Sequence, residues 1–370
     1  MKDYAMLALL LDRLIHGTVL IYRGPEEWRR EAGARPAPDP GELAGLADRL
    51  LDGEPSPYVA AQLRAMRAVA RHLAGERLPL AGFAGEVLGV RPGWRPEEEF
   101  ARAHDLLDRA LPKGPGTLAV RLAAWQDVHR LTRMELLPEL VAEAAAECRA
   151  RTESLAGLPG TDRLDCQVVS GVPYHAAGHH DGGSRSTIYV NGDLPFNVAD
   201  LLYVVAHEGY PGHIAESLVI SRAGLPEQRV RFMLSPSFLV SEGLGLCAQE
   251  IVFPGGQARE WLDSAMLPRL GIRPDGADLA AIHTFRNVVW GVWANAAFLA
   301  AEGRPDGEVA AYLSRWALLS EEEAGLALAH VRPSVLTPYL FGYSEGWRVV
   351  KERIGTPDQI RHLLSGRALP

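Results

Sequence analysis

Two histidines stand six residues apart near the middle of the chain, and a glutamate directly follows the first. Residues 197–220 read NVADLLYVVAHEGYPGHIAESLVI and contain His207, Glu208 and His213. A His-Glu pair on a buried helix, with a second His shortly after, is how zinc hydrolases arrange two metal ligands and a general base. The pattern therefore indicates a metal site in which Glu208 is the base.

The spacing of the two histidines requires an irregular helix. In the usual form of the signature they are four residues apart, about 40° around a helix of 3.6 residues per turn. At a spacing of six, His207 and His213 are about 120° apart, so a regular helix could not aim both at one ion. Pro211 cannot donate to the carbonyl of His207, and Gly209 and Gly212 tolerate unusual backbone angles. We predict a bulge of two residues that returns His213 to the face of His207.

A buried helix whose His and Glu are merely hydrogen-bonded, ended by Pro-Gly, is the alternative. Glu208 argues against it, because glutamate is rarely fully buried unless it is paired or near a metal.

The segment HEGYPGH resembles the H-E-x-x-P-G-H motif of a bacterial family known as domain of unknown function 885. That family is similar to zinc peptidases that use a glutamate as third ligand. The resemblance covers roughly residues 186–346. It implies a mainly α fold of helical, zinc-peptidase-like (gluzincin-like) architecture, with a small β-sheet beside the motif helix.

The expected third ligand is Glu242, in the apolar stretch SPSFLVSEGLGLCAQEI. A carboxylate in such a run needs a partner, and two neutral histidines on zinc leave room for an anionic ligand. Its Ser-Glu-Gly matches the start of the family's E-G-W-A-x-Y tract, from which Leu244 and Cys247 depart. A local cap or salt bridge is the alternative for Glu242. Glu250 is the second candidate ligand, and Glu216 is expected to accept a hydrogen bond from a ligand histidine.

Two tyrosines are candidates for stabilising an oxyanion. VLTPYLFGYSEGWRVV resembles the family's P-G-Q-A-L-S-Y-K-x-G stretch, with Tyr343 at the tyrosine. A phenol near the metal can donate to the oxyanion that forms when water attacks a carbonyl. Tyr343 is the first candidate and Tyr339 the second. The alternative is that each satisfies a single structural hydrogen bond.

The apolar helix expected at residues 278–302 carries one strong charge, Arg286. That arginine either pairs with a buried carboxylate or holds a substrate carboxylate. The family often carries an Asp and a His farther along this helix, where Trp290 and Ala294 stand here. That difference indicates an altered substrate or altered chemistry.

Two short, β-branched segments, residues 165–172 and 186–191, are predicted to be strands. In zinc peptidases of this type, an edge strand beside the motif helix binds the extended substrate backbone. The resemblance assigns that part to the second strand, which includes Tyr189.

Between the strands, PYHAAGHHDGGSR is predicted to be a loop because of its proline and glycines. Its His179 and His180 are expected to line the substrate cleft. A structural or solvent-facing role, or a second metal site that uses His175 and His179, are the alternatives.

The remaining chain is predicted to be largely helical, with a helical N-terminal region at 1–156 and a metal-site catalytic region at 157–370 that form one continuous domain. Apolar residues recur at three- and four-residue spacing in several segments. The predicted helices are 58–75, 96–111, 117–150, an apolar helix within 228–251, and 308–330; the predicted loops are 33–41 and 88–96, and 356–370 is expected to be a polar tail.

Composition limits the class of protein and partner. Hydrophobic residues make up 47% of the 370-residue chain, which is typical of a globular protein. A net charge of −8 without a basic run argues against a nucleic-acid partner. Three cysteines without C-x-x-C spacing suit a reducing compartment.

The N-terminal YAMLALLLDRLIHGTVLIY superficially resembles a secretion signal. Asp12, Arg13 and His16 interrupt its apolar core, and no small-residue cleavage site follows. No stretch reaches the roughly 18 uninterrupted apolar residues of a membrane span. We expect an amphipathic helix here and a cytoplasmic protein without membrane contact.

The sequence thus predicts a zinc metallohydrolase with His207, His213 and Glu242 as ligands, although iron or manganese would suit the same donors. Glu208 would be the base toward metal-activated water in cleaving an amide bond of a small peptide or peptide-like metabolite. The alternative is a non-hydrolytic metal-dependent enzyme or a metabolite-binding protein on the same scaffold. Nothing in the sequence predicts an oligomeric state.

Overall fold

Helices dominate the computed structural model of the protein, which describes residues 1–158, 160 and 162–370, so the predicted mainly α class is confirmed. The α-helices are α1 (Lys2–Leu14), α2 (Glu26–Ala34), α3 (Pro40–Asp52), α4 (Pro57–Leu73), α5 (Leu80–Leu88), α6 (Glu97–Ala110), α7 (Leu118–Val128), α8 (Leu137–Ala156), α9 (Leu201–Glu208), α10 (His213–Ala223), α11 (Pro236–Val252), α12 (Gln257–Trp261), α13 (Leu279–Ala301), α14 (Asp306–Ala317), α15 (Glu321–Val331), α16 (Thr337–Lys351) and α17 (Pro357–Leu364). Shorter turns of other helical types are η1 (Met134–Leu136), η2 (Val198–Asp200), η3 (Pro226–Arg229), η4 (Leu262–Met266) and η5 (Leu267–Leu270).

Four of these helices begin at the same local signal, a polar capping residue followed by proline. The caps are Asp39, Ser56, Ser235 and Thr356, and each side-chain oxygen accepts a hydrogen bond from the backbone N–H three residues later. Proline suits the first helical position because its missing N–H would have no intrahelical partner there. The cap at Ser235 fixes the start of α11, the helix that carries Glu242.

Two small sheets accompany the helices. Strands β1 (Val19–Tyr22) and β5 (Val230–Phe232) pair antiparallel. In the second sheet, β4 (Arg185–Asn191) lies between β2 (Arg163–Val169), to which it is parallel, and β3 (Ala176–His180), to which it is antiparallel. Ile188 and Val190 of β4 are fully buried, whereas Tyr189 between them is only half-buried, so one face of the sheet packs on the core.

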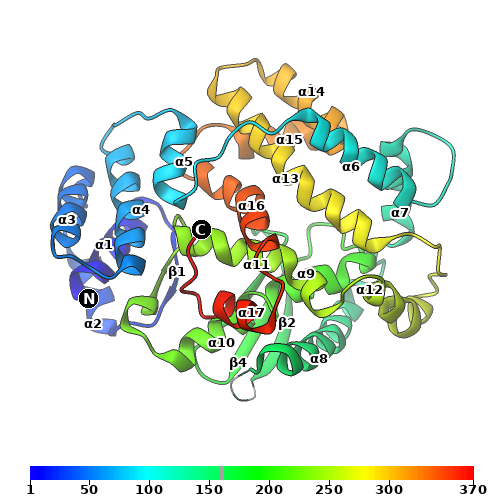
Figure 1. Ribbon diagram of the computed structural model, residues 1–370, viewed down its shortest axis with the longest axis horizontal. Coiled ribbons are helices and arrows are strands. Elements are labelled where there is room, and N and C mark those ends of the chain that lie inside the picture. The colour runs from blue at the N-terminus through cyan, green and yellow to red at the C-terminus, as the bar shows by residue number, and fades with distance from the viewer. Residues whose placement is uncertain (159, 161) are drawn as a thin grey trace.

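One hydrophobic core extends through the molecule, from Tyr4 in α1 to Ala368 near the C-terminus. Helices α1 to α4 lie together at one end, α6, α7 and α12 lie toward the other, α14 and α15 lie along the top, and α11 and α16 are in the middle (Figure 1). The N-terminal region packs on the C-terminal region through α6 against α13 and α5 against α16. Among the described residues, no helix is long and apolar enough to cross a membrane.

Helices α11 and α16 are in close backbone contact, and two glycines make this possible. A Cβ added at Gly243 would lie 2.1 Å from the carbonyl oxygen of Gly346, and one added at Gly346 would lie 2.3 Å from the carbonyl oxygen of Leu239. These neighbours are backbone atoms, which cannot rotate away. The two glycines therefore set how close Glu242 of α11 comes to the tyrosines of α16.

Several predicted elements differ from the structure. The predicted N-terminal helix ends at Leu14, and the following apolar residues form β1, because β-branched Val19 and Ile21 pair with β5. The predicted helix 117–150 is divided into α7 and α8 by residues 129–136, which include η1.

The C-terminal predictions need two further corrections. The predicted helix 308–330 is two helices, since Leu318 ends α14 in the left-handed conformation with φ of 59°. The predicted polar tail contains α17, whose Ile360 and Leu363 are buried in the core.

The segment between the two predicted strands is not a loop, because it contains β3. The strand predicted at 186–191 exists as β4, but it is central rather than an edge strand. The strand beside the motif helices is β3, which packs on α9 and α10. Gly178 explains the error, because a glycine in the sequence indicates a turn. In β3 it instead lets the strand approach α9 closely, since a Cβ there would lie 2.0 Å from the carbonyl oxygen of Glu208.

Substituting Gly243 tests the contact between α11 and α16. We expect Gly243→Ala to lower the free energy of unfolding by about 3 kcal/mol or more, since overpacking against backbone forces the two helices apart. Denaturant unfolding would measure it. Gly342→Ala in α16 is the matched control, because a Cβ there meets nothing within 4 Å. It should be neutral or stabilise by up to about 1 kcal/mol. Equal effects of the two substitutions would contradict this account of the contact.

Candidate metal centre

The helix that carries the first histidine is interrupted where the sequence predicts. Helix α9 ends at Glu208 and α10 begins at His213. Across the break, Gly212 N–H donates to the carbonyl of Ala206, and Ala215 N–H to that of Gly209, both at 3.0 Å. These bonds span six residues instead of the four of an α-helix, so two extra residues are accommodated. The predicted bulge is confirmed.

The bulge brings His207 and His213 together. Their ring centroids lie 4.8 Å apart, with the ring planes at 83°. Gly212 is required for this turn, because a Cβ there would lie 1.7 Å from the carbonyl oxygen of His207. The convergence therefore depends on backbone that only glycine provides.

Glu242 reaches both histidines from α11. Its Oε2 lies 3.4 Å from Nε2 of His207, and its Oε1 lies 3.7 Å from Nε2 of His213. Ligand atoms bonded at about 2.0–2.1 Å to a tetrahedral zinc are about 3.3–3.4 Å apart. The two observed separations are close to that value, and the two-nitrogen, one-carboxylate donor set suits zinc, with iron and manganese as alternatives.

The hydrogen bonding of Glu242 is also consistent with a metal ion bound at its carboxylate. Its Oε2 is buried and, among the residues that the structure describes, has no hydrogen-bond donor, although His207 Nε2 approaches to 3.4 Å. A buried carboxylate oxygen without a partner is costly in the absence of a nearby positive charge. A metal ion between Glu242 and the two histidines would provide that charge.

Glu208 lies beside the three proposed ligands, His207, His213 and Glu242, and is not itself one of them. Its Oε1 is 4.0 Å from Nε2 of His207, farther than either approach of Glu242 to a histidine. Ligand atoms of His207, Glu208 and His213 nevertheless all lie within 4.8 Å of one another. Glu208 Oε2 accepts a hydrogen bond from the backbone N–H of Gly178 in β3, at 2.8 Å, which fixes the carboxylate.

Burial dominates the pKa shifts of His213 and Glu208, whereas the pKa of His207 is raised because its carboxylate neighbours outweigh burial. Burial lowers the pKa of His213 to about 3, so the ring is neutral at ordinary pH and has a lone pair free to ligate a metal. Burial also raises the pKa of Glu208, and the neighbouring charge of Glu242 adds to the increase. A raised pKa suits a carboxylate that must both take up and release a proton.

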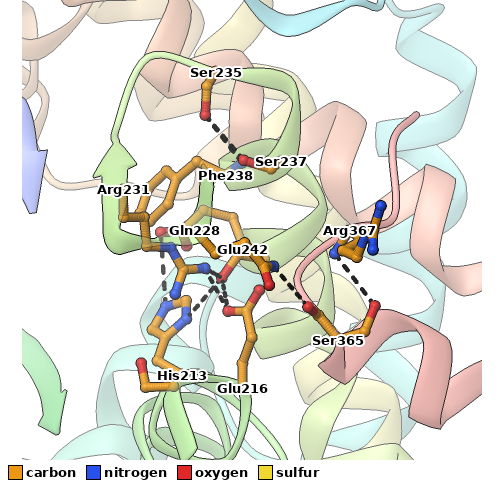
Figure 2. Close-up of polar contacts among 12 residues, drawn as sticks. His213, Glu216, Gln228, Arg231, Ser235, Ser237, Phe238, Glu242, Ser365 and Arg367 are labelled. Carbon is orange, nitrogen blue, oxygen red and sulfur yellow. Dashed lines mark hydrogen bonds and ion pairs between the residues drawn. The ribbon is translucent and has the colours of Figure 1, made fainter. Parts of the chain in front are cut away.

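A hydrogen-bonded chain orients His213. Ser241 Oγ donates to Glu216 Oε2 at 2.6 Å, so it can only accept from His213 Nδ1, which lies 3.1 Å away. Arg231 binds both Glu216 and Ser241, and Figure 2 shows it beside Glu216 and His213. With the proton on Nδ1, the lone pair of Nε2 faces Glu242 and the cluster. Glu216 therefore does not accept a hydrogen bond from His213 directly, as predicted, but is linked to it through Ser241.

Gly245 of α11 lies directly against the imidazole ring of His207. A Cβ at this position would lie 2.6–2.8 Å from three atoms of the imidazole ring. Any larger residue would force the ring out of its position. The glycine thus acts on the site by leaving room for a ligand side chain.

Two tyrosines of α16 border the cluster. The hydroxyl of Tyr339 donates to Glu242 Oε1 at 3.3 Å and lies 2.6 Å from the hydroxyl of Tyr343. Tyr343 in turn stacks on Trp290 of α13, with centroids 4.2 Å apart. Both predicted tyrosines are near the site, but Tyr339, the second candidate, contacts the cluster directly.

Arg286 follows the first of its two predicted roles. Its Nη1 forms an ion pair of 2.5 Å with Asp200, which is buried and also contacts His283 Nε2 at 3.1 Å. Burial alone would raise the pKa of Asp200, but the charges of Arg286 and His283 lower it to about 2. The pair joins the start of α9 to α13.

Three other predicted substrate-binding residues lie away from the cluster. His180 is buried, and its Nδ1 contacts the Arg185 carbonyl and Ser186 Oγ, both at 3.1 Å. His179 is exposed on the opposite face of β3 from Gly178, the residue that touches Glu208. Tyr189 alternates with Ile188, whose side chain approaches Gly209, so it faces away from the motif.

Glu250, the second candidate ligand, is also elsewhere, because it forms an exposed ion pair with Lys351. The sequence reasoning missed the contributions of Ser241, Arg231 and Gly245 to the site. Of these three residues, only Gly245 could have been identified from the sequence, because a glycine inside an apolar helix indicates close approach by another group.

Comparisons with known proteins add little to this geometry. No family model matches the chain, and no curated protein matches it. A solved structure that it resembles is that of a proposed lipoprotein of unknown function from Shewanella oneidensis, with 13% identity and a TM-score of 0.48. The match covers 93% of this chain and 62% of that one, so the chain spans less than two thirds of that protein.

Removing the hydroxyl that orients His213 tests this centre. We expect Ser241→Ala to weaken zinc binding by roughly 10- to 100-fold, because the Nδ1 proton loses its acceptor. Competition with a chromophoric chelator would measure the affinity. Ser237→Ala, one turn earlier in α11, should bind zinc like the parent, since its hydroxyl contacts Gln62 and Ser235. Parent-like affinity in Ser241→Ala would refute the orienting role.

Proposed function

We propose that the protein is a metal-dependent hydrolase that cleaves an amide bond in a small peptide or peptide-like metabolite. The observation that carries the proposal is the approach of buried Glu242 to within 3.4 and 3.7 Å of two histidine Nε2 atoms, with Glu208 beside them. His207, His213 and Glu242 would hold the ion. Zinc bound there would act as a Lewis acid that lowers the pKa of water and polarises a carbonyl group.

Glu208 is the general base in this proposal. Its carboxylate takes a proton from the water molecule that attacks the substrate carbonyl carbon. When the carbon–nitrogen bond breaks, Glu208 returns that proton to the leaving nitrogen. The hydrogen bond from Gly178 N–H holds one oxygen, which leaves the other, Oε1, facing the cluster at 4.0 Å from His207 Nε2.

Tyr339 is the best-placed donor for the oxyanion that forms on the attacked carbonyl. It already contacts Glu242, and Tyr343 is positioned to donate to its hydroxyl. Burial raises the pKa of both phenols, so both keep their protons at ordinary pH. Tyr343, stacked on Trp290, would hold Tyr339 in place.

A relationship to domain of unknown function 885 and a zinc-peptidase-like architecture belong to the same proposal. Their support is the helix pair α9–α10 with glutamate on a third helix, and β3 as an edge strand alongside. In such enzymes the edge strand binds extended substrate. Here β3, rather than β4, would have that part.

A non-hydrolytic enzyme or a metabolite-binding protein is the second candidate. The feature that favours it is Trp290, which stacks on Tyr343 in the part of α13 where the resembling family often carries an Asp and a His. The position of Glu208 favours hydrolysis, because a simple binding protein has no use for a buried base beside the metal ligands.

The central test of the mechanism is Glu208→Gln. The substitution keeps the size and the acceptor for Gly178 but removes the base, so we expect near-stoichiometric zinc and a loss of at least about 100-fold in turnover. A dipeptide and acyl-amino-acid library, read by mass spectrometry, would supply the substrate. Glu250→Gln, which alters an exposed ion pair, is the matched control and should retain activity.

His213→Ala should lose both metal and activity. If Glu208→Gln turned over a true substrate as fast as the parent, Glu208 would not be the base. The protein would then have to be interpreted as a metal-binding scaffold.

The two tyrosines can be separated by removing one hydroxyl at a time. We expect Tyr339→Phe to reduce kcat by roughly 100- to 1,000-fold, because it removes the donor nearest the cluster. Tyr343→Phe should cost less, since Tyr339 stays in place. Steady-state kinetics on the substrate identified above would measure both effects. A larger loss in Tyr343→Phe would reverse the assignment.

A further inference from the structure

A second polar pocket lies behind the candidate metal centre, on the far side of Glu216. Arg23, Glu216, Gln228, Arg231 and Ser237 are among its lining residues. Glu216 belongs to both places, because its Oε2 accepts from Ser241, the residue that orients His213. Figure 2 shows Glu216, Arg231 and Gln228 near one another beside His213.

Strand pairing places the two arginines over the same pocket. Ile21 of β1 is directly opposite Arg231 of β5, and Arg23, the residue after β1, continues the pairing by donating its N–H to the carbonyl of Arg229, so Ile21, Arg23 and Arg231 lie on one face. Diagonal neighbours of this kind have Cα atoms about 7–8 Å apart, within reach for long side chains. Arg23 and Arg231 accordingly line the same pocket.

Arg23 brings to the pocket a positive charge that has no ion-pair partner among the described residues, although the charge of Asp181 acts on it from farther away. Glu216 neutralises Arg231 through an ion pair. Arg23 instead donates to two neutral carbonyl groups, those of His180 at 3.0 Å and Ser217 at 3.4 Å. Within the described part of the chain, no carboxylate lies within 4.0 Å of its nitrogens. Burial lowers the pKa of Arg23, and the charge of Arg231 lowers it further.

We propose that Arg23 and Arg231 bind one small monovalent anion of the halide type. Guanidinium groups are weakly hydrated and recognise anions readily. The remaining walls combine apolar Ile220 and Val230 with polar Gln228 and Ser237, and the cavity volume of about 20 Å³ has room for about one water-sized ion. The anion site stands on these residues alone and does not depend on the metal.

The contacts of Arg231 also predict that anion binding affects the candidate metal centre. Arg231 is joined to His213 through Ser241, and its positive charge therefore lies close to the place proposed for the metal. An anion beside Arg231 would offset that charge and favour a cation at His213. By linkage, halide and zinc should strengthen each other's binding, by roughly a few-fold. This coupling, unlike the anion site, rests on the proposed metal function.

Bromide provides the direct test. Crystals of the metal-free protein soaked in sodium bromide should show an anomalous peak between the guanidinium groups of Arg23 and Arg231. In solution, bromide or chloride should raise Tm by about 2 °C or more over sodium sulfate of equal ionic strength. The shift should vanish in Arg23→Gln and persist in Arg229→Gln. Arg229 is exposed, lies opposite Arg23 on the chain leading into β5, and is the matched control.

The absence of a peak at this place, or an equal halide shift in all three proteins, would overturn the proposal. An equal or larger shift with sulfate would overturn the choice of a monovalent ion. If Arg23→Gln does not fold, Arg23→Lys replaces it, with a weakened halide response expected because the forked donor is lost. Halide binding without a change in zinc affinity would remove the coupling and leave the anion site.

Discussion

The structure around the centre depends on one backbone irregularity, the two-residue bulge between α9 and α10. Hydrogen bonds that span six residues let the chain continue as a helix after the turn while His213 returns to the side of His207. The turn tolerates only glycine at position 212, and β3 can approach it only because residue 178 is also glycine. Backbone proximity, more than side-chain packing, therefore decides where the two rings meet.

Helices α11 and α16 complete the arrangement in the same way. Gly243 and Gly346 let the two helices touch, and Gly245 makes room for the His207 ring. Glu242 can then approach both histidines, and Tyr339 can approach Glu242. The result is a group of two buried carboxylates and two half-buried imidazoles, and paired carboxylates are costly to bury without a cation.

The sequence predicted the features of this site that depend on neighbouring residues in the chain and missed those that depend on long-range contacts. Pro211 and its flanking glycines predicted the bulge, because their backbone restrictions are local. Glu242 could be selected as a charge in an apolar helix. The roles of His179, His180 and Tyr189 depended on which face of which strand they occupy, and sheet order is a long-range property.

Other features could not be predicted from the sequence because they also depend on tertiary contacts. Ser241 and Arg231 join His213 only because the side chain of Arg231 in β5 contacts Glu216 of α10 and Ser241 of α11, and no local pattern encodes those contacts. Helix boundaries at Leu318 and in residues 129–136 were also missed, since tertiary packing overrides the apolar periodicity there.

The most direct measurement of the central claim is the position of zinc in a crystal of the protein supplied with one equivalent of the metal. Anomalous diffraction at the zinc edge should give one peak, at about 2.0–2.2 Å from Nε2 of His207, Nε2 of His213 and a carboxylate oxygen of Glu242. No bound zinc, or zinc held by other residues, would contradict the account.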